Sequence, residues 1–228
     1  MSDIPRVHDP KELVARGYDA VAGAYAALER PEAEWPRLRR LRELLALTPE
    51  GSAVLDIGCG NGVPATRAIA AAHEAVGVDI SHAQVDLARR NVPAASFVHG
   101  DIMAVDFRPG SFAAVVAFYV LDHLPRDEHA ALFERVAGWL RPGGHFLFTV
   151  EHGEEPGMVG EWLGTPMFFS QFDSETTLTL LEGTGFEVLE RAVEAQSEGD
   201  TEVEYLWVLA RARGVTRGPR ARRSASPR

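Results

Sequence analysis

Short apolar runs alternate with helix-like segments through the middle of this 228-residue chain. The runs that read as strands lie at residues 53–57, 75–79, 96–99, 112–119 and 145–150. Alanine-rich or amphipathic segments lie between them, at residues 65–72, 83–90 and 128–140. Continuous apolar runs are typical of strands that are buried on both faces. Their alternation with helices predicts an α/β fold, a mostly parallel sheet with helices on both faces, wound right-handedly.

The ends of the chain have a different organisation. Residues 11–28 and 35–47 repeat apolar positions every three or four residues, which predicts two amphipathic helices before the sheet. Residues 151–172 are rich in Gly, Pro and aromatics and have no regular pattern, so we expect an irregular segment that acts as a lid. A helix at residues 174–182 and strands at 186–192 and 203–209 complete the fold. The expected organisation is a helical extension or cap (1–50), a core (51–210) with a lid insertion (152–172), and a disordered Arg-rich tail (211–228).

Charge and composition exclude several classes of protein. The net charge is −10, and residues 211–228 carry seven Arg and no acid, which leaves 16 basic and 33 acidic residues in residues 1–210. A body of this sign repels phosphate backbones, so we expect no nucleic-acid partner. Apolar runs fall short of the ~20 residues of a membrane span, and no signal-peptide core is present, so we expect no membrane partner and a cytoplasmic protein. Cys59 is the only cysteine, which excludes an internal disulfide and a multi-cysteine zinc site.

The strongest motif is the sequence VLDIGCGNG at residues 54–62, an apolar strand followed by glycines at every second position. Glycines let a ligand lie against the backbone, and the helix that follows offers free N–H groups. A dinucleotide fingerprint would place its third glycine at Val63, so the motif does not favour NAD or FAD. A Walker-type phosphate loop is also absent, because Lys11 is the only lysine.

Three acids close successive predicted strands beside this loop. They are Asp56, Asp79 in the run VGVD, and Asp101 in the run GDI. A carboxylate at the end of the second strand is suited to accept hydrogen bonds from both hydroxyls of a ribose. Three acids with no phosphate-binding group indicate a cationic or neutral nucleoside ligand.

With these motifs, residues 120–125 and the run LRPGG at 140–144, the chain resembles the class I S-adenosylmethionine-dependent methyltransferases from about residue 18 to 210. The resemblance implies a Rossmann-like, seven-stranded, mostly parallel sheet whose last strand is antiparallel. It also implies S-adenosyl-L-methionine as the cofactor and S-adenosyl-L-homocysteine as the product. The cofactor-binding residues that it implies are Tyr18, Tyr25, Asp56, Gly58, Cys59, Gly60, Asp79, Ile80, Asp101, Ile102 and Phe118.

Each part of the cofactor has implied contacts. In the family, the positions of Asp56, Gly58 and Gly60 border the methionine moiety, and that of Asp79 binds the ribose. The positions of Asp101 and Ile102 hold the adenine, Phe118 lines the floor, and Tyr18 and Tyr25 lie on a helix that closes over the cofactor. Cys59 reads as a small residue that fills the loop rather than as a catalytic thiol.

The acceptor side of the site is less specific in sequence. Residues 161–173 resemble a subgroup of bacterial enzymes that act on small molecules, and Trp162, Met167, Phe168 and Phe169 are expected to shape an apolar acceptor pocket. These aromatics are also compatible with a small core under the loop. Residues 118–121 read FYVL, unlike the Asn- or Asp-Pro-Pro-aromatic motif of many nucleic-acid amino methyltransferases.

Three residues are candidates for a general base. His123 follows the fourth strand, where it is equally suited to fix a turn, and Glu151 and His152 follow the fifth. The sequence has no evident acidic triad for magnesium, so we expect no metal.

These observations predict a metal-independent methyltransferase that moves a methyl group from S-adenosylmethionine to O, N, S or C of a small, partly apolar molecule, as a monomer or homodimer. Two alternatives stay open. One is an enzyme of the same fold that uses the cofactor for a rearrangement without methylation. The other is a non-catalytic cofactor-binding or scaffold protein.

Overall fold

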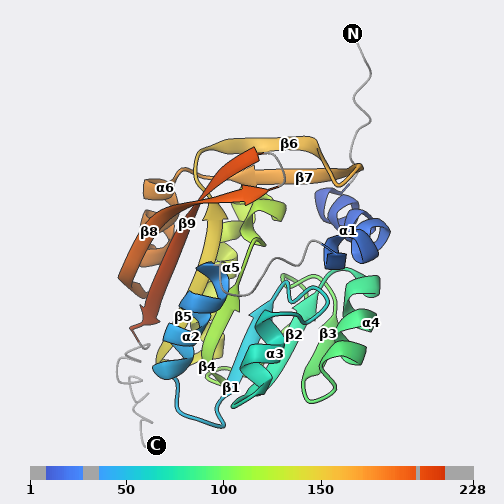
Figure 1. The fold of residues 1–228 in the computed structure, drawn as a ribbon. Helices are drawn as coiled ribbons and strands as arrows, with labels where there is room; N and C mark the ends of the chain where they lie inside the picture. The colour runs from blue at the N-terminus through green and yellow to red at the C-terminus, as the bar shows by residue number, and fades with distance from the viewer. Residues whose placement is uncertain (1–8, 28–35, 199–200, 214–228) are drawn as a thin grey trace, which may run out of the picture.

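A seven-stranded sheet with the order β3-β2-β1-β4-β5-β9-β8 forms the centre of the protein (Figure 1). The computed structural model describes residues 9–27, 36–198 and 201–213. The strands of this sheet are β1 (Ala53–Ile57), β2 (Glu74–Asp79), β3 (Ser96–His99), β4 (Phe112–Ala117), β5 (Leu140–Glu151), β8 (Phe186–Glu198) and β9 (Thr201–Ala212). The first five pair in parallel, and β9 pairs antiparallel with both β5 and β8. The predicted α/β fold, with its antiparallel last strand, is confirmed.

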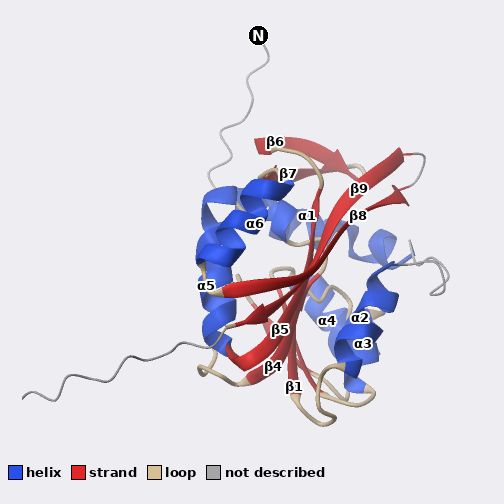
Figure 2. Cartoon of the chain, turned by 90° about the vertical axis from the view of Figure 1, so that its left-hand side faces the viewer, coloured by secondary structure: helices blue, strands red, loops and turns tan. Residues whose placement is uncertain are grey.

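Helices cover both faces of the sheet (Figure 2). They are α1 (Pro10–Ala27), α2 (Pro36–Ala46), α3 (Ala65–Ala70), α4 (His82–Asn91), α5 (His129–Trp139) and α6 (Ser174–Gly183), with short 3-10 turns η2 (Leu121–His123) and η3 (Arg126–Glu128). In Figure 2, α5 and α6 lie on one side of the sheet, and α2, α3 and α4 lie on the other. No helix in the described part of the chain is long and apolar enough to cross a membrane.

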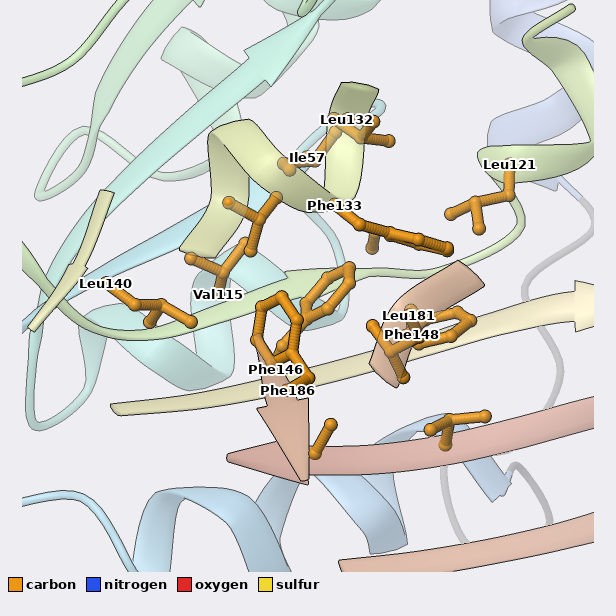
Figure 3. Close-up of a cluster of buried hydrophobic side chains, with 14 of the residues drawn as sticks. Ile57, Val115, Leu121, Leu132, Phe133, Leu140, Phe146, Phe148, Leu181 and Phe186 are labelled. Carbon is orange, nitrogen blue, oxygen red and sulfur yellow. The ribbon is translucent and has the colours of Figure 1, made fainter. Parts of the chain in front are cut away.

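A cluster of aromatic side chains fixes the sheet against α5 and α6 (Figure 3). Phe133, Phe146, Phe148 and Phe186 are fully buried, and the rings of Phe146 and Phe148 stack with 4.8 Å between their centroids. Truncating such a side chain to alanine costs about 3 to 5 kcal/mol, so this core contributes strongly to the packing of β5 and β8 against α5.

The last two strands are longer than the sequence indicates. Predicted at 186–192 and 203–209, they form β8 and β9, of 13 and 12 residues. Charged residues such as Glu187 and Arg211 alternate with apolar ones there, and these two pair across the strands at 2.8 Å. Since β8 lies at the edge of the sheet, its exposed positions take charges, which hides the strand from a search for apolar runs.

The core also ends later than expected, because β9 runs through Ala212, past the predicted limit at residue 210. Residues 214–228 of the predicted tail lie outside the described residues, as do residues 1–8 and 28–35 of the predicted extension.

The expectation of an irregular segment at residues 151–172 is wrong. Strands β6 (Glu155–Trp162) and β7 (Thr165–Gln171) pair antiparallel in a separate two-stranded sheet, at the top of Figure 1. Leu163 and Gly164 connect them with φ values of +51° and +77°, as in a two-residue type I′ turn. Leucine is unusual at such a position, so the turn is absent from the sequence pattern. Helix α1 packs against β7, which fixes the hairpin beside the carboxyl ends of the central strands.

Candidate functional site

The glycine loop after β1 brings bare backbone against the end of β4. Gly58 has φ +65°, and a Cβ atom there would lie 2.2 Å from Cγ2 of Val120. Only glycine fits this conformation and this contact. The backbone N–H groups of Gly58 and Cys59 donate to the carbonyl of Val78 at 2.8 and 3.0 Å, so the loop is fixed to β2.

Asp79, at the end of β2, connects the loop to the next helix. Its Oδ2 accepts a hydrogen bond from the Gly60 N–H at 2.8 Å, and its Oδ1 accepts one from the Ser81 N–H at 2.8 Å. Burial raises the pKa of Asp79 to about 6, against the opposing effect of these two hydrogen bonds. The carboxylate is therefore held in one orientation beside the loop and is largely shielded from solvent.

Gln84, in the first turn of α4, is a site residue that the sequence reading missed. Its side chain is 1% exposed, and neither its Nε2 nor its Oε1 has a hydrogen-bond partner among the described residues. The Oε1 lies 3.9 Å from where a Cβ of Gly60 would be. A buried amide without partners costs about 1 to 3 kcal/mol, so this one indicates a missing polar ligand.

The sequence around Gln84 fits a helix N-cap, so the pattern gives no sign of a ligand-binding role. Ser81 caps α4, its Oγ accepting from the Gln84 N–H at 3.1 Å, and Ser followed three residues later by Gln is the capping-box pattern. In a capping box the Gln side chain would accept from the Ser81 N–H. Asp79 already accepts from that N–H, so the Gln84 amide does not form this hydrogen bond and instead lines the cavity.

One cavity of about 690 Å³, partly open to solvent, collects most of the predicted cofactor residues. The predicted residues that line it are Tyr18, Tyr25, Gly58, Gly60, Asp79, Ile80, Asp101, Ile102, Phe118 and His123, together with Gln84.

Asp56 and Cys59 lie beneath the loop and do not belong to the cavity lining. The Oδ2 of Asp56 accepts from Oγ1 of Thr66 at 2.5 Å, and burial raises its pKa to about 7. The Cys59 sulfur is buried, 2.8 Å from where a Cβ of Gly77 would be, and burial raises its thiol pKa. Both residues support the loop from below.

Helix α1 closes the cavity from above through contacts with three elements. The Asp19 carboxylate accepts from the Ser81 hydroxyl at 2.6 Å and the Ala83 N–H at 3.0 Å, at the start of α4. Lys11 Nζ lies 2.7 Å from Oδ2 of Asp101 and 3.0 Å from Oε1 of Glu128. These are contacts between residues far apart in sequence, so no local pattern predicts them.

His123 in η2 is held at both ring nitrogens. Its Nε2 lies 2.8 Å from the Tyr18 hydroxyl, and its Nδ1 lies 2.9 Å from the Phe168 carbonyl oxygen on β7. Burial lowers the pKa of His123 to about 4, so the imidazole is neutral near pH 7. This histidine is at the cavity wall, between α1 and the hairpin.

Glu151 and His152 lie away from the cavity lining. The Glu151 N–H donates to Oδ1 of Asp122 at 2.7 Å, in the connection between β5 and η2. The exposed ring of His152 lies 2.8 Å, at Nδ1, from Oγ of Ser174, at the start of α6. In the part of the chain that the structure describes, no group of three or more His, Cys, Asp or Glu is arranged to hold a metal ion.

The four predicted acceptor residues lie on the hairpin, behind the cavity rather than in its lining. Met167 is buried against Gly17 of α1, and the Phe169 ring lies 5.1 Å from that of His123. Phe168 contributes its backbone carbonyl, and Trp162 is partly buried on β6. The hairpin thus supports His123 and α1.

Comparisons with known proteins agree with this arrangement. The family described as methyltransferase domain matches residues 54–144. The chain is 32% identical over 143 residues to the tRNA (carboxymethyluridine(34)-5-O)-methyltransferase alkbh8 of Xenopus tropicalis, which covers 61% of this chain and 21% of that protein. It is 31% identical over 190 residues to the (+)-O-methylkolavelool synthase of Herpetosiphon aurantiacus, which covers 75% of this chain and 65% of that protein. The chain spans less than two thirds of the length of each of these relatives.

The structure of the DhpI–SAH complex superimposes with a TM-score of 0.67 at 22% identity, covering 93% of this chain and 99% of that one. At this identity the match shows a shared fold. Taken with the matched family, the order of the sheet and the glycine loop, it shows that this chain belongs to the class I S-adenosylmethionine-dependent methyltransferases.

Proposed function

We propose that the cavity binds S-adenosylmethionine and that the chain catalyses transfer of its methyl group to a small, partly apolar molecule. The observation that carries the proposal is the corner made by Gly60, Asp79 and Gln84. There, a positive-φ glycine, a buried carboxylate and a buried amide without partners face one cavity. A ligand with a polar sugar and a charged amino-acid end would supply hydrogen-bond partners for these groups.

The other lining residues fit the remaining parts of such a ligand. Asp79 is oriented to accept from the ribose hydroxyls, with Gln84 beside it as a donor and acceptor for the same end of the ligand. Ile102 is 6% exposed and Phe118 is 5% exposed, and both offer apolar surface. We assign Ile102 to the adenine and Phe118 to the floor, next to the bare backbone of Gly58.

The cofactor would supply an electrophilic methyl group on a sulfonium. The chain's own contribution is positioning, since methyl transfer chiefly requires a nucleophile held in line within about 3 to 3.5 Å of the methyl carbon. Helix α1, fixed by Lys11, Tyr18 and Asp19, covers part of the cavity and limits its opening to solvent. The neutral imidazole of His123 lies at the cavity wall, whereas His152 does not line the cavity.

Charge and lining favour a small acceptor over a nucleic acid. Residues 1–210 carry 33 acids against 16 bases, which opposes the approach of a phosphate backbone. Around His123 the lining is apolar, with Val14, Val120 and Leu124. An uncharged, partly apolar acceptor matches these walls.

Calorimetry with S-adenosylmethionine and S-adenosylhomocysteine tests the cofactor assignment. Both should bind, and Asp79→Ala should weaken the affinity by about 1 to 3 kcal/mol through loss of hydrogen bonds to a charged group. Transfer of labelled methyl to phenols, alcohols, amines, carboxylates and thiols then tests the reaction. Binding of both compounds without transfer to any acceptor would favour a non-catalytic role, and no binding would contradict the proposal.

A further inference from the structure

Tyr18 and His123 meet across the cavity although they lie on separate elements. Tyr18 extends from α1 and His123 from η2, and both line the cavity. The hydroxyl oxygen lies 2.8 Å from Nε2, and the rings meet edge-on with 5.3 Å between their centroids. Their separation of 105 positions in the sequence places this contact beyond any local motif.

The position of each proton in this contact follows from the third partner. The Phe168 carbonyl can only accept a hydrogen bond, so Nδ1 of His123 carries the hydrogen at the 2.9 Å contact. A neutral imidazole with its hydrogen on Nδ1 has a lone pair on Nε2. The Tyr18 hydroxyl therefore donates to Nε2, and the hairpin carbonyl fixes this tautomer.

We propose that Tyr18 is a catalytic residue that removes the proton of an acceptor hydroxyl and relays it to His123. The inference rests on the proposed function and deepens it, because it changes which residue touches the acceptor. Both ring nitrogens of His123 already have hydrogen-bond partners, so the acceptor reaches the tyrosine oxygen rather than the imidazole.

The acceptor oxygen bonds to the methyl carbon while the methyl–sulfur bond breaks and leaves its electron pair on sulfur. The acceptor proton passes to the Tyr18 oxygen, and the Tyr18 proton passes to Nε2 of His123. The positive charge of the sulfonium is thus replaced by that of an imidazolium. Burial disfavours this imidazolium, with the pKa of His123 at about 4, so it returns its proton to solvent once the products leave.

The surroundings indicate the class of acceptor. Val14, Val120 and Leu124 line this part of the cavity, and Lys11 is engaged by Asp101 and Glu128. A carboxylate or thiolate would need no base, whereas a neutral hydroxyl needs one. The relay therefore fits an uncharged, partly apolar phenol or alcohol.

The test uses the full-length protein, labelled S-adenosylmethionine, and phenol, 4-methylphenol, 4-nitrophenol and 1-octanol as acceptors. Removing a general base typically costs about 10² to 10⁴-fold in rate, so Tyr18→Phe should lower kcat on phenol by that factor. The assays are run at pH 8, where 4-nitrophenol, a much stronger acid than phenol, is largely ionised, so its rate should fall far less, within about tenfold. His123→Gln should behave alike, and the double variant should be no slower than either single one, because both act in one relay.

Tyr25→Phe separates the relay from a general effect on α1, since it removes another hydroxyl from the same helix and the same cavity. We expect Tyr25→Phe to alter the affinity for the cofactor. It should not make the rate on phenol fall more than the rate on 4-nitrophenol. ¹⁵N NMR of the His123 ring gives a readout without turnover. Nε2 should resonate as an unprotonated, hydrogen-bonded nitrogen, and its signal should shift in Tyr18→Phe.

Two results would overturn the relay while leaving the cofactor site intact. One is an equal loss of rate on phenol and 4-nitrophenol in Tyr18→Phe, which would mean a purely structural role, or no loss of rate, which would mean that the Tyr18 hydroxyl does not contribute to the reaction. The other is the absence of methylation of every hydroxyl compound by a preparation that binds S-adenosylmethionine. A preparation that does not bind the cofactor would instead contradict the proposed function itself.

Discussion

The carboxylate of Asp79 accepts a hydrogen bond from the backbone N–H of Gly60 at 2.8 Å, joining the acid at the end of β2 to the glycine loop after β1. Two adjacent strand–loop units are thereby fixed to each other at the wall of the cavity. The same contact orients the carboxylate and keeps it from rotating away. Preorganisation of this kind reduces the ordering cost that binding would otherwise carry.

The first prediction concerns the pH dependence of cofactor affinity. The pKa of Asp79 is raised to about 6, mainly by burial, and only the ionised carboxylate accepts hydrogen bonds from both ribose hydroxyls. The affinity should therefore rise with pH, and binding at pH 5 should be about tenfold weaker than at pH 7. Calorimetric titrations with S-adenosylmethionine across this range measure it.

Asp79→Asn should bind weakly and with little dependence on pH. Asp56→Asn is the matched control, because Asp56 is a buried acid beneath the same loop that does not line the cavity. It should keep the slope between pH 5 and pH 7. A slope that persists in Asp79→Asn would assign the titration to another group.

The second prediction is that Gln84→Leu changes stability and binding in opposite directions. Replacing a buried amide without partners by a side chain of similar volume removes a desolvation penalty, so the ligand-free protein should unfold at an equal or higher temperature. Binding of S-adenosylmethionine should weaken by about 1 to 2 kcal/mol, since the ligand loses its partner. Thermal unfolding with and without ligand gives both quantities.

Gln171→Leu provides the comparison for this variant. Gln171 on β7 is 5% exposed and its Oε1 also has no partner, but it does not line the cavity. Its replacement should leave the affinity unchanged. Equal loss of binding in the two variants would mean that Gln84 acts through the fold and not through the ligand.

The third prediction concerns Asp56 and stability. Burial raises its pKa from 3.8 to about 7, so between these values the native state binds more protons than the unfolded state. The free energy of unfolding then falls as pH rises through this window, and the associated contribution is lost above pH 7. Asp56→Asn has no such titration, so its stability relative to the natural chain should increase from pH 5 to pH 8. Urea unfolding at both values measures the difference, and a constant difference would contradict the assigned pKa.

The glycine loop and the acid at the end of β2 could be predicted from sequence because their chemistry is local. Glycine at Gly58 is required by backbone conformation and by contact with the next strand end, and Asp79 follows an apolar run that must be a buried strand. These features leave the same signal in any chain that folds this way. The parallel sheet follows from the same runs.

The features that could not be predicted from the sequence depend on competition for a hydrogen bond or on contacts between residues distant in the sequence. Gln84 fits a capping box, and only the structure shows that Asp79 takes the N–H that the box requires. Lys11 and Tyr18 reach partners at least 90 positions away in the sequence, which no spacing rule covers. The hairpin was missed because Leu163 stands where such turns normally have Asn, Asp or Gly.

The last prediction uses that turn. Leu163 has φ +51° and is 38% exposed, so its side chain gains little from packing while its backbone adopts a conformation that costs L-residues about 1 to 2 kcal/mol. Asn tolerates this conformation, so Leu163→Asn should raise the free energy of unfolding by about 0.5 to 1 kcal/mol. Leu163→Ala is the control, since alanine retains the Cβ and lacks the local hydrogen bonding of asparagine, and it should give no such gain. Equilibrium urea unfolding distinguishes the two. Strand β7 contacts His123 and α1. Leu163→Asn should also slow hydrogen exchange of the β6–β7 amides, because a more stable hairpin opens less often. Unchanged exchange with unchanged stability would mean that the strain at Leu163 is relieved elsewhere.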